Sequence, residues 1–99
     1  MTKNYTTYVF SEPVNLGRSF SGLLELVRRY WRIPVVSGTQ FLFFNSRRDY
    51  LKAIRYDGTG FVILAKKLDA GVFPPCASKL TQKQVEALLE GCATEHVAA

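Results

Sequence analysis

The sequence predicts an α+β domain: a four-stranded, mostly antiparallel sheet with one helix packed across a face, followed by a C-terminal helix. Three observations favour this. Residues 40–73 form three extended segments rich in aromatic and β-branched residues and joined by tight turns. Apolar stripes at helical spacing lie before them, over residues 16–31, and after them, over residues 80–92. The 99 residues suffice for one core, so we expect a single domain over 1–99.

The first predicted strand is Tyr5–Phe10, which is β-branched and aromatic and ends before Pro13. The first predicted helix begins near Leu16, with Asn15 as its N-cap. It ends by Ile33–Pro34, because a residue that precedes proline disfavours helical geometry. Its apolar stripe consists of Leu16, Phe20, Leu23, Leu24, Val27, Tyr30 and Trp31.

Two further expectations concern this first helix. Glu25 and Arg29 are four residues apart in the favourable order, which predicts an ion pair on the outer face. Gly22 costs the helix about 1 kcal/mol relative to alanine. From that cost we infer that Gly22 marks a close approach of the helix to the sheet.

The turn Asp57–Gly60 sets the register of the last two extended segments. If Asp57 pairs with Gly60, then Tyr56 faces Phe61, and the side chains alternate between two faces of the sheet. One face carries Tyr50, Lys52, Ile54, Tyr56, Phe61, Ile63, Ala65 and Lys67; the other carries Leu51, Ala53, Arg55, Val62, Leu64 and Lys66. The first face is either a core rimmed by lysines or a platform on which bases stack.

The last helix has a well-marked start. Thr81 and Gln84 form a capping box, and Leu80 and Val85 flank it as a hydrophobic staple. Its apolar stripe is Val85, Leu88, Leu89 and Cys92. The stripe could pack on its own sheet, cover a sheet edge or bind a partner, and we expect packing on its own sheet.

Positive charge is concentrated in the centre of the chain. The net charge is +5, and residues 18–67 carry ten Lys or Arg against three acids. Such a centre favours a polyanionic partner such as a nucleic acid. We expect phosphate contacts from Arg47, Arg48, Lys52, Arg55, Lys66 and Lys67. Further candidates are Arg28, Arg29 and Arg32 for phosphates, and Tyr30, Trp31, Tyr50 and Tyr56 for base stacking.

The residues that could carry catalysis have simpler structural roles. Asp57 heads a turn, Asp69 begins a loop, and Asp49 can neutralise a neighbouring arginine. We expect no enzyme activity, no cofactor and no metal site, because Cys76, Cys92 and His96 have no partners for metal or thiol chemistry. No apolar run approaches the roughly 18 residues of a membrane span. No signal peptide is apparent, and we expect a cytoplasmic protein without a membrane partner.

Four ordered segments carry a family resemblance: 13–23, 41–49, 56–61 and 66–73. They are similar to "P-V-D-M-R-K-S-F-D-G-L", "L-F-V-F-x-N-R-R-R-D", "W-D-G-x-G-F/L" and "K-R-L-E-x-G-x-F". This pattern resembles the TnpB-type accessory protein, the second reading frame (Orf2-like) of IS-sixty-six-type insertion sequences, over roughly residues 8–92. The departures are Asn15, Leu16, Gly17 and Ser46.

The resemblance implies a non-catalytic accessory factor of DNA transposition, since a separate transposase carries the catalytic acids in this family. DNA and that transposase are the implied partners. The residues favour DNA binding through the basic meander. One alternative is a protein-interaction module that docks on the transposase or forms a homo-oligomer, because both sheet faces are fairly apolar. The other is a degenerate copy without transposition activity.

Overall fold

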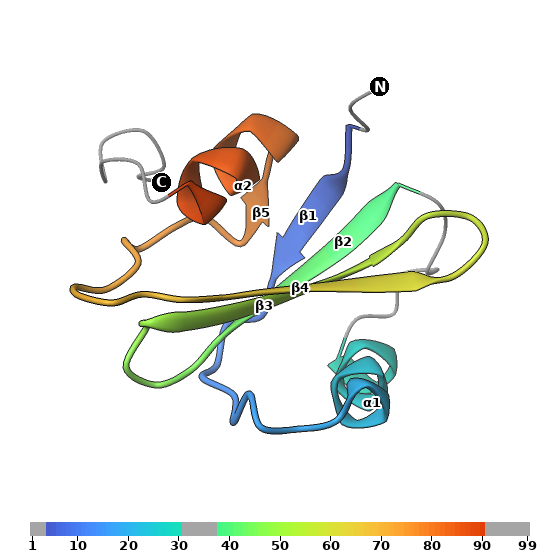
Figure 1. The fold of residues 1–99 in the computed structure, drawn as a ribbon. Coiled ribbons are helices and arrows are strands. Elements are labelled where there is room, and N and C mark those ends of the chain that lie inside the picture. The colour runs from blue at the N-terminus through green and yellow to red at the C-terminus, as the bar shows by residue number, and fades with distance from the viewer. Residues whose placement is uncertain (1–3, 31–37, 91–99) are drawn as a thin grey trace.

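The computed structural model describes residues 4–30 and 38–90. Its elements, in chain order, are β1 (Thr6–Val9), α1 (Phe20–Tyr30), β2 (Thr39–Phe44), β3 (Tyr50–Tyr56), β4 (Phe61–Lys67), β5 (Lys79–Leu80) and α2 (Gln82–Leu89) (Figure 1). The expectations that concern Trp31, Arg32, Cys92, His96 and the side chain of Tyr30 lie outside the described residues. In the described part, neither helix has the length and apolar character needed to cross a membrane.

The α+β class is confirmed, but the sheet has five strands and is mixed. Its order is β4-β3-β2-β1-β5, and β1 and β2 are parallel while the other pairs are antiparallel. The prediction of four strands was therefore wrong in number. It missed β5, a two-residue strand that pairs Leu80 with Thr7. Helix α1 is the crossover that two adjacent parallel strands require.

Strand β2 is the centre of the molecule, and all six of its residues are buried. Successive side chains of a strand point to opposite faces, so β2 supplies both cores. Phe41 and Phe43 belong to the core on the α1 side of the sheet, and Leu42 and Phe44 to the core on the α2 side. Figure 1 shows the two helices on opposite sides of the sheet.

Helix α2 packs on its own sheet, which resolves the three options left open by its sequence. Val85 and Leu88 are buried against Leu42 and Leu51. The predicted capping box is confirmed: Gln84 N donates to Thr81 Oγ1 (3.2 Å), and Thr81 N donates to Gln84 Oε1 (2.9 Å). Val85 and Leu88 of the predicted stripe are therefore buried within the chain, Leu89 is half-buried, and Cys92 lies outside the described residues.

Helix α1 begins later than the sequence predicted, and its cap is a different residue. Ser19 Oγ accepts a hydrogen bond from Gly22 N (3.2 Å) at the first turn. Asn15 Oδ1 instead accepts from Gly17 N (2.9 Å), a local turn ahead of the helix. Both residue types are good caps, so sequence alone did not separate them. The predicted ion pair between Glu25 and Arg29 is present, at 3.8 Å.

The inference about Gly22 was wrong. A Cβ at this position would meet the side chains of Arg18 and Ser19, at 3.4 and 3.6 Å, and these belong to the preceding turn of the chain. The sheet is not among its nearest neighbours. The space around Gly22 is therefore limited by residues at the start of α1 and not by the sheet.

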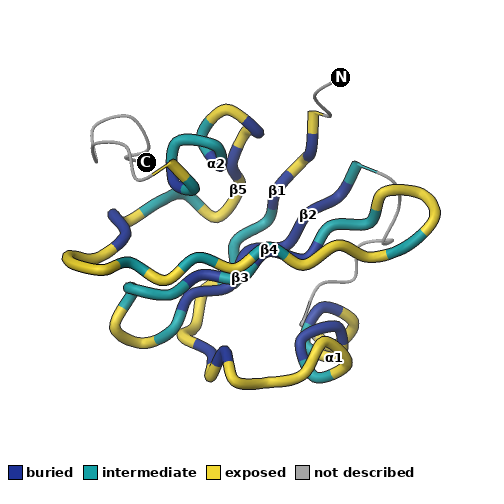
Figure 2. Tube along the Cα trace, viewed as in Figure 1, coloured by how far each residue is buried: buried dark blue, intermediate teal, exposed yellow. Residues whose placement is uncertain are grey.

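The predicted hairpin register is confirmed. Tyr56 faces Phe61, and Asp57 N donates to Gly60 O (3.0 Å). The aromatic face, however, is neither wholly core nor wholly platform. Its β3 part is core, since Ile54 is buried on the α1 side, whereas on β4 Phe61 and Ile63 are exposed. Figure 2 shows the same change, from buried β2 to largely exposed β4.

Candidate nucleic-acid interface

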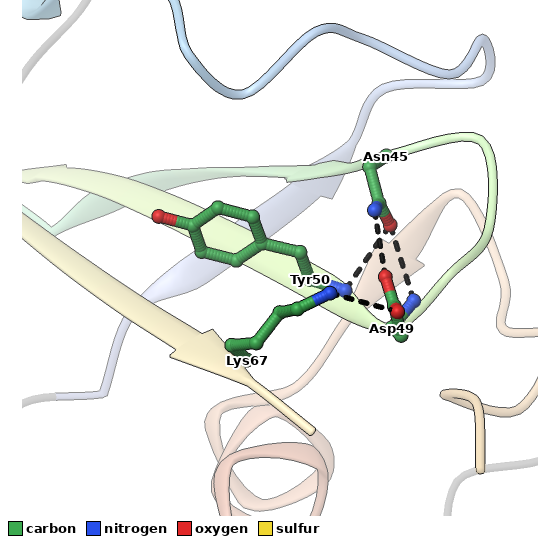
Figure 3. Close-up of polar contacts among 4 residues, drawn as sticks. All are labelled: Asn45, Asp49, Tyr50 and Lys67. Carbon is green, nitrogen blue, oxygen red and sulfur yellow. Dashed lines mark hydrogen bonds and ion pairs between the residues drawn. The ribbon is translucent and has the colours of Figure 1, made fainter. Parts of the chain in front are cut away.

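The turn between β2 and β3, which carries the two arginines, is organised by Asn45 (Figure 3). Its Oδ1 accepts hydrogen bonds from the backbone N–H groups of Asp49 and Tyr50, both at 3.1 Å. Its Nδ2 donates to Asp49 Oδ1 (2.7 Å). Asparagine commonly closes turns in this way. This role of Asn45 was not predicted from the sequence, although its position at the start of the turn is a signal for it.

Asp49 is the acid of this turn, and its partner is a lysine on β4. Lys67 Nζ donates to Asp49 Oδ2 at 2.8 Å. The hydrogen bond from Lys67 lowers the pKa of Asp49 below its usual value, and the hydrogen bond from Asn45 adds to this. Asp49 is therefore a carboxylate at neutral pH, and its direct ionic contact is with Lys67 and not with either arginine of the turn.

Arg48 contacts the protein itself. Its Nη2 donates to Pro74 O (2.6 Å), its Nε donates to Phe73 O (3.2 Å), and its guanidinium lies 4.0 Å from the centroid of the Phe44 ring. The backbone contributes as well, since Phe73 N donates to Arg48 O (2.6 Å). Arg48 thus joins the β2–β3 turn to the chain that follows β4.

Arg55 is also held by intramolecular contacts, on the α2 side of the sheet. Its Nε donates to Gln40 Oε1 (2.8 Å), and its guanidinium lies 4.5 Å from the centroid of the Tyr5 ring. Gln40 is fully buried and donates in turn to Thr7 Oγ1 (2.9 Å). This polar row crosses β3, β2 and β1, and it satisfies groups that would otherwise be buried without partners.

Lys66 contacts the end of α2. Its Nζ donates to the carbonyl oxygen of Leu89, the last residue of the helix. A cation at a helix C-terminus interacts favourably with the partial negative charge there. Lys66 therefore ties β4 to α2 and faces away from Lys67, which lies on the opposite face of the strand.

Of the six predicted cations, the structure brings three to one corner of the sheet. We call Arg47, Lys52 and Lys67 the basic corner. Arg47 is exposed on the turn and close enough to Asp49 to lower its pKa. Lys67 pairs with Tyr50 across the strands, and Lys52 Nζ lies 5.8 Å from the Tyr50 ring centroid. The remaining three, Arg48, Arg55 and Lys66, are engaged elsewhere.

A surface hollow adjoins the basic corner. It encloses about 490 Å³ between the chain at Pro13–Gly17 and the turn at Asn45 and Ser46, with Tyr50 in its lining. Tyr50 is half-buried and packs against the α1-side core. The corner therefore combines two exposed cations, Arg47 and Lys67, and the half-buried Lys52 with one aromatic ring beside a concave surface. Such an arrangement suits a phosphodiester backbone.

The acidic residues are not gathered into a catalytic cluster in residues 4–30 and 38–90, where no group of three His, Cys, Asp or Glu is placed to hold a metal ion. Asp57 has the role expected from its turn. Its Oδ1 accepts from the backbone N–H groups of Thr59 and Gly60, both at 2.9 Å.

Comparison with known proteins agrees with the resemblance of the four sequence segments. The sequence matches the family described as IS66 Orf2-like protein over residues 5–99. The chain belongs to this family. The chain is also similar to the uncharacterized protein y4jC of Sinorhizobium fredii (strain NBRC 101917 / NGR234), at 35% identity over 69 residues. That match covers 68% of this chain and 59% of the relative, so the chain spans less than two thirds of the relative's length. No solved structure matches the chain significantly.

Proposed function

We propose that this IS66 Orf2-like protein is a non-catalytic accessory factor of DNA transposition that contacts DNA phosphates through its basic corner. The family associates the chain with an insertion sequence. The observation that carries the proposed DNA contact is the grouping of Arg47, Lys52 and Lys67 around Asp49 and Tyr50 at one end of the sheet.

The electrostatics of the corner support an anionic partner. Its single acid, Asp49, already accepts hydrogen bonds from Lys67 and Asn45. The Lys67 side chain nevertheless remains 59% exposed, so an incoming phosphate can reach its ammonium group. Contacts with phosphates do not distinguish one base sequence from another, since phosphates are the same at every base pair. The proposal is therefore one of DNA binding with little base selectivity from this corner.

The arrangement of the acids in the described residues supports the proposed non-catalytic role. Two-metal phosphoryl transfer needs carboxylates converging on ions about 4 Å apart. Asp49 and Asp57 are instead bound into two different turns, at opposite ends of β3. Asp49→Asn, Asp57→Asn and Asp69→Asn should therefore leave a magnesium-dependent nuclease assay at background. A carboxylate-dependent cleavage in the wild type, lost in one of these variants, would contradict this part of the proposal.

The DNA contact is tested by titrating the purified protein with element-end and random duplexes over a series of salt concentrations. We expect both duplexes to bind, with affinities that fall together as salt rises, because counterion release dominates phosphate binding. Failure to bind either duplex at low salt would refute DNA binding and leave docking on the transposase as the function to pursue.

A further inference from the structure

Strand β4 is an edge strand of the sheet, and half of its backbone N–H and C=O groups point away from β3. Asp57 N donates to Gly60 O, and Leu68 N donates to Asp49 O, with an unbroken register between them. In an antiparallel pair, hydrogen-bonded positions alternate with non-hydrogen-bonded ones. The even-numbered residues of β4 therefore bond to β3. The outward N–H and C=O groups belong to Phe61, Ile63, Ala65 and Lys67.

The same strand exposes apolar side chains on both faces of the sheet. Phe61 is 37%, Val62 36% and Ile63 37% exposed, and these three residues are consecutive. Exposures of this size are ordinary for single residues, but here they flank an unpaired backbone edge on both faces of the sheet, which favours the addition of another strand. Within the described residues, no segment pairs with the outer edge of β4, and Figure 2 shows the strand largely exposed along its length.

The devices by which proteins usually protect an edge strand are lacking along most of β4. They include proline, a β-bulge and charged side chains spread over the strand. Residues 61–67 contain no proline, and their register with β3 is continuous, without a bulge. The charges lie only at the C-terminal end, at Lys66 and Lys67. The first five residues are thus an unprotected template for another strand.

The positions of Lys66 and Lys67 indicate the direction in which a second copy of β4 can pair with this edge. A parallel second copy would set Lys66 and Lys67 beside the same two lysines. An antiparallel copy instead sets this basic end beside the uncharged Phe61 end of its partner. The two basic ends are then about 20 Å apart, at 3.4 Å per residue. In the register of full overlap, Lys67 lies opposite the Phe61 ring, a favourable pairing for a cation.

We propose that two copies of this chain associate by antiparallel pairing of their β4 strands about a two-fold axis at Leu64. Ile63 of each copy faces Ala65 of the other, and the outward groups of odd-numbered residues bond to one another. The two sheets join into one. A two-fold contact of this kind is self-complementary and closes at the dimer, which removes the exposed edge. The inference does not depend on the proposed DNA contact.

The oligomeric state of the full chain provides the first test, by sedimentation or light scattering. We expect a dimer for the wild type and for Val72→Lys, a control at an exposed apolar residue outside β4. Ala65→Pro should give a folded monomer, because Ala65 uses its N–H only outward and proline is tolerated at such edge positions. Ile63→Lys, which leaves the backbone unchanged, should also give a monomer. A monomeric wild type, an open-ended assembly, or a dimer that survives both β4 variants would overturn the proposal.

Disulfide trapping tests the register. Leu64 on the two-fold axis forms a non-hydrogen-bonded pair with its own copy, in which the Cα atoms are close, at about 4.5 Å. In a Cys76→Ser, Cys92→Ser background, Leu64→Cys should therefore cross-link on mild oxidation, while Val72→Cys should not. Cross-linking through Val62→Cys but not Leu64→Cys would overturn the full-overlap register.

Discussion

Arg47 and Arg48 are neighbours in one turn, but their surroundings differ and indicate different roles. Arg47 is exposed, whereas the Arg48 side chain reaches the carbonyl oxygens of Phe73 and Pro74. Arg48 also has a positive φ of 56°, a conformation that costs free energy in a residue with a Cβ. Its hydrogen bonds and the Phe44 ring contact offset that cost. We therefore regard Arg48 as a residue that maintains the fold.

Alanine variants of Arg47 and Arg48 should differ in their free energy of unfolding. Arg48→Ala loses hydrogen bonds made by a charged group and keeps the strained φ, so we expect a loss of about 1–3 kcal/mol in the free energy of unfolding. Arg47→Ala, its matched control on the same turn, should leave that free energy within about 0.5 kcal/mol. Chemical denaturation measures both. Equal stability of the two variants would contradict the role given to Arg48.

Asp49 predicts a dependence of stability on pH. Its pKa is lowered in the folded state by Lys67 and Asn45. The stability it contributes is therefore present above the unfolded pKa of about 3.9 and is lost as the pH falls through the lowered folded value. The difference in melting temperature between wild type and Asp49→Asn should shrink on acidification below about pH 4. A difference that stays constant down to the most acidic pH at which both remain folded would argue against the Lys67 contact.

At the scale of single residues, the sequence predicted the short-range contacts and missed the long-range ones. The capping box and the Asp57 turn involve partners within three residues, so spacing alone identifies them. The partner atoms of Arg48 lie 25 and 26 residues away, on carbonyl groups that have no side-chain signature. The contact of Arg55 with the Gln40 side chain was not predictable either, because the two residues are 15 positions apart and on different strands.

Helix α2 shows what a short helix needs to remain in place. It has eight residues, fewer than a helix needs to be stable alone in water. Its capping box fixes the start, Lys66 contacts its last carbonyl, and two buried side chains hold it on the sheet. Tertiary contacts therefore supply most of its stability.

Leu88→Ala tests the packing of α2 most directly. Leu88 is 2% exposed in the core on the α2 side, so its truncation should cost about 2–5 kcal/mol of unfolding free energy. Lys83→Ala, on the exposed side of the same helix, is the control and should cost little. A near-neutral Leu88→Ala would show that α2 does not depend on this sheet.

At the scale of elements, the antiparallel meander was predictable because turns set its register. The pairing of β1 was not. Its parallel partner β2 lies beyond α1, and nothing in the period of either strand specifies which neighbour it takes. Strand β5 has only two residues, so no alternation can reveal it. Strand β5 lies where it does because it pairs with β1, and the adjacent hydrogen bond from Val9 N to Ser78 O extends this pairing.

The whole molecule presents two surfaces of different character, and they meet at Lys67. The basic corner lies at the end of the sheet where β3 begins and β4 ends, and the apolar edge runs from there along β4. If both proposals hold, the dimer carries two basic corners on the same face of one sheet. Ala65→Pro should then weaken DNA binding and reduce its salt dependence, although it changes no charge. An unchanged salt slope in this variant would mean that one copy alone makes the DNA contact.

The structure divides the six predicted cations into three at the basic corner and three held by intramolecular contacts, and the salt dependence of DNA binding tests this division. We compare the wild type with Arg47→Ala, Lys52→Ala and Lys67→Ala, and with Lys83→Ala as a charge-matched control on α2. Each corner variant should weaken binding to all duplexes alike and reduce the slope of log K against log salt by up to about 0.9. Lys83→Ala should leave that slope unchanged. Equal slopes for the corner variants and the control would contradict the assignment of DNA contact to Arg47, Lys52 and Lys67.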